Sequence, residues 1–149
     1  MESREIHVAP DRFELSSGEA LLVTELSCAI AVCLYDAAEE AGALLHLRCM
    51  VKSSKPADVT DTTLATELLL LDRCLQCLLQ QSPASRDLQA RIVVHLPESA
   101  ARPAYDTVIA LVKHFLADQG VTLLPEDVAT GQPRRLRFRP NMGWVHTHA

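Results

Sequence analysis

The feature that most constrains the fold is an uninterrupted apolar run from Cys28 to Tyr35. A run of this length and composition is typical of a β-strand whose two faces are both covered. Leu21–Leu26, directly before it, is also strand-like, and we expect these two segments to form the centre of one sheet. After an acidic turn at Asp36–Glu40, the apolar pattern resumes over Gly42–Leu47. The segment therefore predicts a β-hairpin with the preceding strand.

Two amphipathic helices are predicted in the second half of the chain. Leucines recur at helical spacing over Asp61–Gln81, where Asp61 is a candidate N-cap. A second apolar face over Ala104–Asp118 follows Pro103 and ends before Gly120. The shorter strand-like segments are Arg91–Leu96, Val121–Leu124 and Leu136–Phe138. The order of strands, helix, strand, helix and strands predicts the α/β class.

Composition limits the classes of function that the chain can serve. With 149 residues, 16.4 kDa and 48% hydrophobic residues, it can bury the core of one domain that spans residues 1–149. Only 4% of the residues are aromatic and the net charge is -5, which argues against nucleic-acid binding. The charged N-terminal residues do not resemble a secretory signal and no apolar run is long enough to span a bilayer, so we expect a cytoplasmic protein that is not inserted in a membrane.

A cysteine and a histidine are candidates for chemistry. A hairpin that turns about Ala37 sets Cys28 opposite His46, with Cβ atoms roughly 4.5 to 5.5 Å apart. A neighbouring imidazolium lowers the pKa of a thiol and can protonate a leaving group. A turn one residue longer would pair Cys28 with Leu47 and send His46 to the other face. The alternative interpretation is a buried thiol beside a hydrogen-bonded core histidine.

The same region resembles the opening of the CheD family of chemoreceptor glutamine deamidases. In that family a Ser-Cys pair precedes an apolar strand that ends in Tyr-Asp, and a histidine follows on the next strand. The similarity continues in order along nearly the whole chain. The matching segments are Leu26–Asp36, Gly42–His46, the leucine-rich helix, Phe115–Val121, Pro125–Asp127 and Gly131–Pro140.

The resemblance implies a single-domain layered sandwich of mixed, largely antiparallel β-sheet with two main helices. It also implies a protein-glutamine deamidase that converts receptor Gln side chains to Glu without a metal or other cofactor. Cys28 matches the nucleophile, His46 the general acid and base, and Thr24 the polar third residue that orients the imidazole. Ser27, beside the nucleophile, is expected to contact the substrate.

The resemblance further implies partners: the cytoplasmic helical region of methyl-accepting chemoreceptors and a CheC-like phosphatase. A basic stripe of Arg135, Arg137 and Arg139 is a candidate surface for an acidic partner, although many such stripes are only solvated. The chain has Leu26 where the family has a glycine, and Val93-Val94 where it usually has a Gly-Gly pair. A second hypothesis is therefore an interaction module that has kept the fold and the partners but lost efficient catalysis.

Two further patterns favour ordinary structural roles. The five cysteines are an odd number, which argues against a disulfide framework. Cys74 and Cys77 form a Cys-x-x-Cys pattern, but it lies inside a predicted helix without a second ligand pair, so we expect helix-face thiols and no zinc site. His146 and His148 near the C-terminus likewise have no evident third and fourth ligands.

Overall fold

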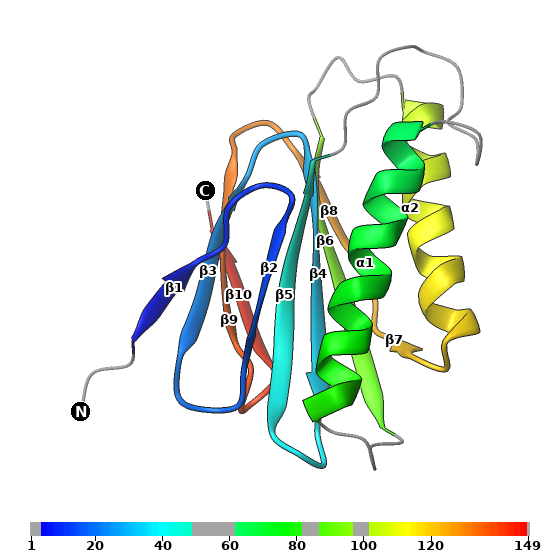
Figure 1. Cartoon of the computed structure of the whole chain (residues 1–149). Helices are drawn as coiled ribbons and strands as arrows, with labels where there is room; N and C mark the ends of the chain where they lie inside the picture. Colours follow the sequence, from blue (N-terminus) through cyan, green and yellow to red (C-terminus); the bar gives the residue numbers. More distant parts are fainter. Residues whose placement is uncertain (1–3, 49–61, 82–86, 97–101, 149) are drawn as a thin grey trace.

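A computed structural model describes residues 4–48, 62–81, 87–96 and 102–148. These residues form three layers: a four-stranded sheet, a six-stranded sheet, and a layer of helices on the outer side of the larger sheet (Figure 1). The strands and helices in chain order are β1 Glu5–His7, β2 Arg12–Ser16, β3 Leu21–Leu26, β4 Ala29–Asp36, β5 Ala41–Arg48, α1 Thr62–Gln81, β6 Leu88–Leu96, α2 Arg102–Asp118, β7 Thr122–Leu123, β8 Asp127–Thr130, β9 Arg134–Arg139 and β10 Trp144–His148.

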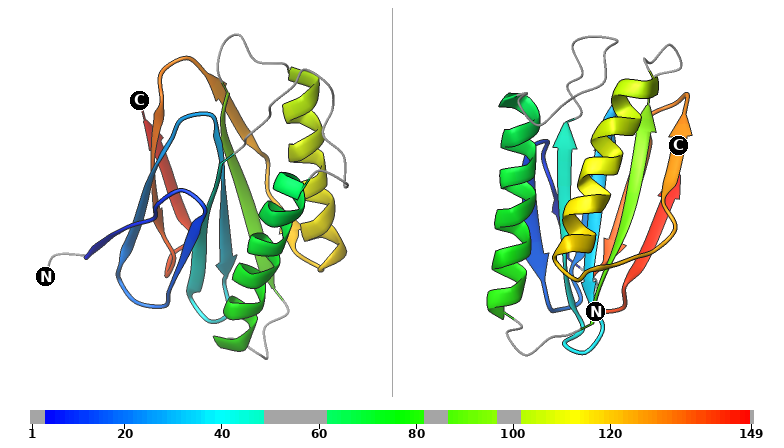
Figure 2. Two further views of the ribbon diagram at one scale, coloured as in Figure 1. Left: turned by 45° about the horizontal axis from the view of Figure 1, so that its top comes forward. Right: turned by 90° about the vertical axis from the view of Figure 1, so that its right-hand side faces the viewer.

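The two sheets differ in how they are covered. The smaller sheet has the order β1-β3-β9-β10, and the larger has the order β2-β5-β4-β6-β7, with β8 also paired to β6. Most pairs are antiparallel, whereas β1 with β3, and β6 with β7 and β8, are parallel. The smaller sheet covers one face of the larger sheet and the helices cover the other (Figure 2). The α/β class and the layered, largely antiparallel arrangement are therefore confirmed.

The apolar run of β4 is buried on both faces because β4 is a central strand of the middle layer. Its Ile30, Val32 and Leu34 face the helices, while Ala31 and Cys33 face the smaller sheet. This alternation divides the core into two apolar layers. The prediction that Leu21–Leu26 and Cys28–Tyr35 lie at the centre of one sheet is wrong, because the chain crosses between the sheets at Ser27 and Cys28.

The predicted hairpin exists, but its register differs from the predicted one. β4 and β5 pair so that Ala31, and not Cys28, is opposite His46. The turn is longer because Asp36 Oδ1 accepts the N–H of Glu39 and Glu40 adopts a positive φ of 52°. Cys28 precedes β4 and lies outside the ladder.

Both predicted helices are present. α1 buries Leu71, Leu75 and Leu78, and α2 buries Val112 and Leu116, against the larger sheet. The candidate N-cap Asp61 lies outside the described residues. Four short strands, β1, β2, β8 and β10, were not predicted, because each lies partly exposed and lacks a continuous apolar run.

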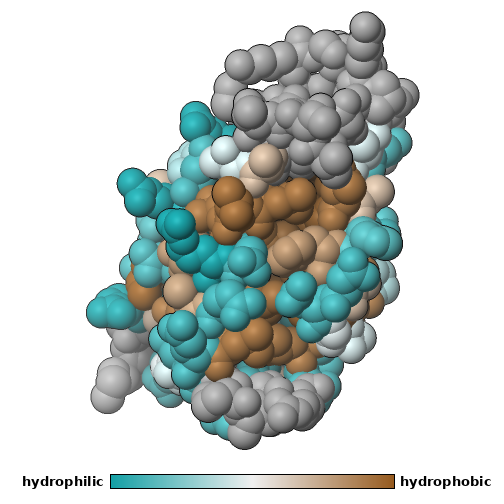
Figure 3. Space-filling model, turned by 45° about the vertical axis from the view of Figure 1, so that its right-hand side comes forward, coloured by the Kyte–Doolittle hydropathy of each residue, from teal (hydrophilic) through white to brown (hydrophobic). Residues whose placement is uncertain are grey.

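Some apolar side chains on the helix side of the molecule are exposed to solvent. Apolar surface is visible on the helix side of the molecule (Figure 3), and Leu69 of α1 is 67% exposed. No helix in the described ranges has the length and apolar character needed to cross a membrane.

The hairpin of β4 and β5 also fixes how closely the two sheets approach. A Cβ atom added at Gly42 would lie 2.3 Å from the carbonyl oxygen of Leu34 and 3.1 Å from the ring of Phe138 in the smaller sheet. We therefore expect Gly42→Ala to lower the free energy of unfolding by about 1–3 kcal/mol, measured by urea titration. Gly18→Ala is the matched control, because nothing lies within 4 Å of its added Cβ. Equal stability of the two variants would contradict this packing.

Candidate functional site

Thr24 and His46 meet in the buried layer between the two sheets. Thr24 lies on β3 of the smaller sheet and His46 on β5 of the larger, and their side chains are only 2% and 3% exposed. Thr24 Oγ1 lies 2.7 Å from His46 Nδ1. The structure thus brings together two of the residues predicted to form the site.

The hydrogen bonds of Thr24 fix which nitrogen of His46 carries the proton. The Thr24 hydroxyl donates to the carbonyl oxygen of Val8 at 2.7 Å, and that oxygen can only accept. The hydroxyl therefore uses a lone pair to accept the Nδ1–H of His46. His46 is consequently the Nδ1–H tautomer, and its Nε2 lone pair is the ring's proton acceptor.

Burial sets the electrostatics of His46. Desolvation lowers the pKa of the imidazole below its ordinary value, the Asp11 carboxylate opposes this, and His7 and Arg48 add to the lowering. The ring is therefore neutral at neutral pH. A neutral imidazole suits a general base that takes a proton from a thiol during attack, in preference to a preformed thiolate–imidazolium pair.

Asp11 holds the end of β5 that carries His46. Its backbone N–H donates to the carbonyl oxygen of His46 at 2.8 Å, and its carboxylate pairs with Arg48 at 2.6 Å. Glu67 of α1 lies against the same cluster, where burial and the Asp11 carboxylate raise its pKa to about 8. This cluster was not predicted, because Asp11, Arg48 and Glu67 share no sequence motif and only the tertiary fold brings them together.

Cys28 lies at the corner where the chain passes from β3 to β4. Its φ is 53°, a left-handed conformation that residues with a Cβ seldom adopt and that is often found at functional sites. The residue is half-buried, whereas Cys33 is fully buried and its pKa is raised by burial to about 12. Cys28 is thus a half-buried cysteine in a constrained backbone, and Cys33 is a core residue.

A second histidine contacts this corner. His95 Nδ1 accepts the backbone N–H of Cys28 at 2.9 Å, and His95 Nε2 lies 2.9 Å from the carbonyl oxygen of Gly131. Nδ1 accepts and Nε2 donates, so His95 is the opposite tautomer to His46. His95 was not among the predicted site residues, although a histidine two positions after Val93 in an apolar strand indicates a polar side chain that faces inward.

The two histidines flank the strand that follows Cys28. Ala31 of β4 is opposite His46 of β5, and Ala29 of β4 is opposite His95 of β6. Because β4 lies between β5 and β6, the backbones that carry the histidines are roughly 10 Å apart. Among the described residues, no hydrogen bond joins Cys28 Sγ to His46. The observed register pairs His46 with Ala31, so the contact between Cys28 and His46 remains a prediction.

The remaining predicted residues lie outside the buried layer that holds Thr24 and His46. Ser27 is exposed in the corner beside Cys28. Arg135, Arg137 and Arg139 alternate along β9 with the buried Leu136 and Phe138, so they lie on the outer face of the smaller sheet. Beside them on β10, Trp144 and His146 stack with ring centroids 5.5 Å apart. The histidines near the C-terminus therefore belong to this outer face.

The Cys-x-x-Cys pattern lies within α1, as expected. Cys74 is buried and its pKa is raised by desolvation to about 12, while Cys77 is half-buried. In the described part of the chain, no group of three or more His, Cys, Asp or Glu side chains is arranged to hold a metal ion.

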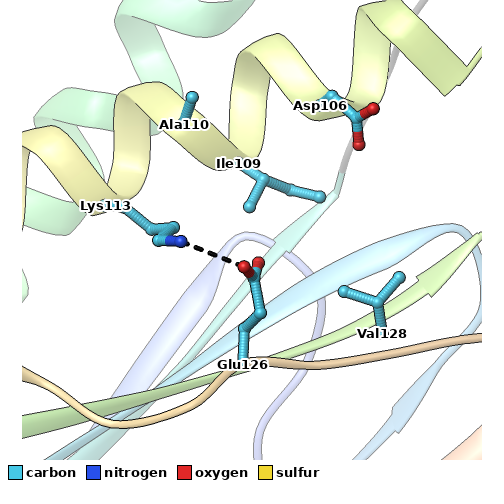
Figure 4. A pocket seen from close by; sticks show the side chains of 6 residues that line it. All are labelled: Asp106, Ile109, Ala110, Lys113, Glu126 and Val128. Carbon is cyan, nitrogen blue, oxygen red and sulfur yellow. Dashed lines mark hydrogen bonds and ion pairs between the residues drawn. The ribbon is translucent and has the colours of Figure 1, made fainter.

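A separate cavity of about 520 Å³ lies between α2 and the strand β8 (Figure 4). Its charged groups include Lys113 and Glu126, which form an ion pair at 3.0 Å across it. Asp106 and Ile109 line the same cavity from α2. These lining residues include no cysteine or histidine, so the Cys28 corner is the stronger candidate for covalent chemistry.

Comparisons of the sequence with protein-family models and with curated proteins found no match. The structure itself joins Thr24 to His46, and it sets Cys28 at a strained corner bound to His95. The candidate site is the end of the layer between the sheets at which these four residues lie.

The lowered pKa of His46 predicts an acid-sensitive fold. The unfolded chain binds a proton at His46 near pH 6.5 and the folded protein only at lower pH, so stability should fall as the pH falls below about 6.5. His46→Asn keeps an N–H donor near the position of Nδ1 but does not titrate. We expect urea titrations between about pH 7.5 and 5.5 to show a smaller loss of stability for this variant than for the unmodified protein. Identical losses would contradict the buried neutral imidazole.

Proposed function

We propose that this protein is a protein-glutamine deamidase of the CheD type. The observation that carries the proposal is the Thr24–His46 hydrogen bond, which spans the two sheets and fixes the tautomer of a buried imidazole. In the sequence resemblance, Thr24 matches the polar third residue of that family and His46 matches its general acid and base. Cys28, strained and half-buried at the adjoining corner, is the nucleophile.

The reaction follows from these groups. His46 Nε2 takes the thiol proton as Cys28 Sγ attacks the amide carbon of a Gln side chain, and a C–S bond forms. The C–N bond then breaks, and His46 returns the proton to the departing ammonia. Water, deprotonated by the same nitrogen, attacks the thioester; Glu is released and the thiol is restored. The proposed mechanism uses neither a metal nor another cofactor.

The partner is a methyl-accepting chemoreceptor, whose cytoplasmic helices carry the Gln substrates, and a CheC-like phosphatase is a second partner. The outer face of the smaller sheet offers a docking surface, because Arg135, Arg137 and Arg139 form a row beside the stacked Trp144 and His146. Such a row complements the carboxylates of an acidic helical surface, and an exposed aromatic ring adds contact area. We expect the protein to work in the cytoplasm.

A second candidate function is an interaction module without efficient catalysis. The observation that favours it is the hydrogen bond from the Cys28 N–H to His95 Nδ1. The N–H of a nucleophile commonly stabilises the oxyanion that forms during attack, and here that donor is engaged. The module would bind the receptor through the same arginine face and leave its glutamines unchanged.

Substitutions at the site separate the roles of its residues. Cys28→Ser should nearly abolish the conversion of Gln to Glu in a purified receptor fragment, because a hydroxyl is far less acidic than a thiol. Thr24→Ala should lower the rate by roughly fivefold, since a typical orienting hydrogen bond contributes about 1 kcal/mol. Mass spectrometry of the receptor peptides reports the conversion.

Cys77→Ser is the matched control, because it removes another half-buried thiol on α1 and should leave the rate unchanged. Unaltered conversion by Cys28→Ser would refute the nucleophile. Binding of the fragment without conversion by the unmodified protein would favour the interaction module.

The arginine face predicts an electrostatic effect on association. Arg135→Glu should slow binding to the receptor fragment several-fold and weaken its dependence on salt, measured by surface plasmon resonance at several ionic strengths. Arg73→Glu makes the same change of charge on an exposed residue of α1, on the opposite side of the molecule. Equal association rates for these two variants would show that the β9 arginines are only solvated.

A further inference from the structure

His95 connects two segments that are distant in the sequence. Its ring lies on β6, accepts the Cys28 N–H at one nitrogen and reaches the carbonyl oxygen of Gly131, before β9, with the other. His95 is 3% exposed, and both of its hydrogen bonds are partly buried. A single buried imidazole thus ties the corner of the candidate nucleophile to the turn between β8 and β9.

The corner needs such a restraint. A cysteine with a φ of 53° has a less favourable backbone conformation than one in the β region, so surrounding contacts must hold it there. The bond to His95 Nδ1 acts directly on the N–H of this residue. The adjoining residues Leu26 and Ala29 are buried on either side and fix the ends of the corner.

We propose that His95 is a positioning residue that holds Cys28 in its left-handed conformation and thereby sets the orientation and reactivity of the thiol. The catalytic meaning of this role rests on the proposed deamidase function, whereas the effect on the thiol does not require any substrate. His95 holds Cys28 through its Nδ1 atom, which accepts the Cys28 N–H. The Nε2–H bond to Gly131 orients the ring and selects its tautomer.

Two conservative variants separate the two bonds. His95→Asn retains an acceptor oxygen near the position of Nδ1 and loses the group that reaches Gly131. His95→Gln extends a donor toward Gly131 and loses the acceptor for the Cys28 N–H. A purely structural role in tying the strands together would make the two variants alike, or would favour His95→Gln.

The test measures alkylation of each thiol by iodoacetamide with peptide mass spectrometry. Cys49→Ser serves as the background so that the labelled cysteines are those that the structure describes. Cys77 is the internal reference, because it is half-buried on α1 and belongs to a different layer. Thermal melting of each variant verifies that it is folded.

We expect His95→Asn to keep the ratio of Cys28 to Cys77 alkylation within about twofold of the unmodified protein, because its side-chain oxygen still accepts the Cys28 N–H. His95→Gln should lower that ratio at least several-fold. Equal ratios in both variants, a greater loss in His95→Asn, or a faster reaction of Cys28 in His95→Gln would each overturn the proposal.

A deamidation assay on the unmodified protein distinguishes the two proposals. If it converts no glutamine while the Asn and Gln variants differ in alkylation as expected, the deamidase fails and the positioning role stands. If conversion occurs but the two variants alkylate alike, the positioning role fails and the deamidase stands.

Discussion

The proposed chemistry of this protein depends on the hydrogen bond between Thr24 and His46. It joins two polar side chains inside a mostly apolar layer, where an unpaired donor would be costly. Because Thr24 already donates to Val8, the pair has one consistent arrangement of protons. The packing of one sheet on the other therefore selects the tautomer of the proposed base and determines which nitrogen of His46 has a free lone pair.

The corner at Cys28 also follows from the packing of the two sheets, because the chain passes there from one sheet to the other. β3 and β4 are consecutive yet lie in different sheets, so the residues between them must turn sharply. The positive φ falls on Cys28 itself and not on Leu26, which stays buried in β3. The turn therefore forms with Leu26 at the end of β3 and needs no glycine there. His95 of β6 supplies a polar contact at this corner.

Sequence periodicity was sufficient for the helices and the longer strands, because α1 and α2 each bury a leucine- or valine-rich face and β4 is covered on both sides. It did not predict the register of β4 with β5, which depends on the side-chain bond of Asp36 in the turn. The pairing of Thr24 with His46 came from the family resemblance. His95 and Asp11 were missed because their partners lie in segments far away in the sequence.

The most direct test of this account is a long-range proton–nitrogen NMR spectrum of the histidine rings near neutral pH. It should show His46 protonated at Nδ1 with a bare Nε2, and His95 with the reverse arrangement, in one sample. Thr24→Val should alter the His46 signals and leave those of His95 in place. A His46 ring protonated at Nε2, or charged at both nitrogens, would contradict the base on which the proposed deamidation depends.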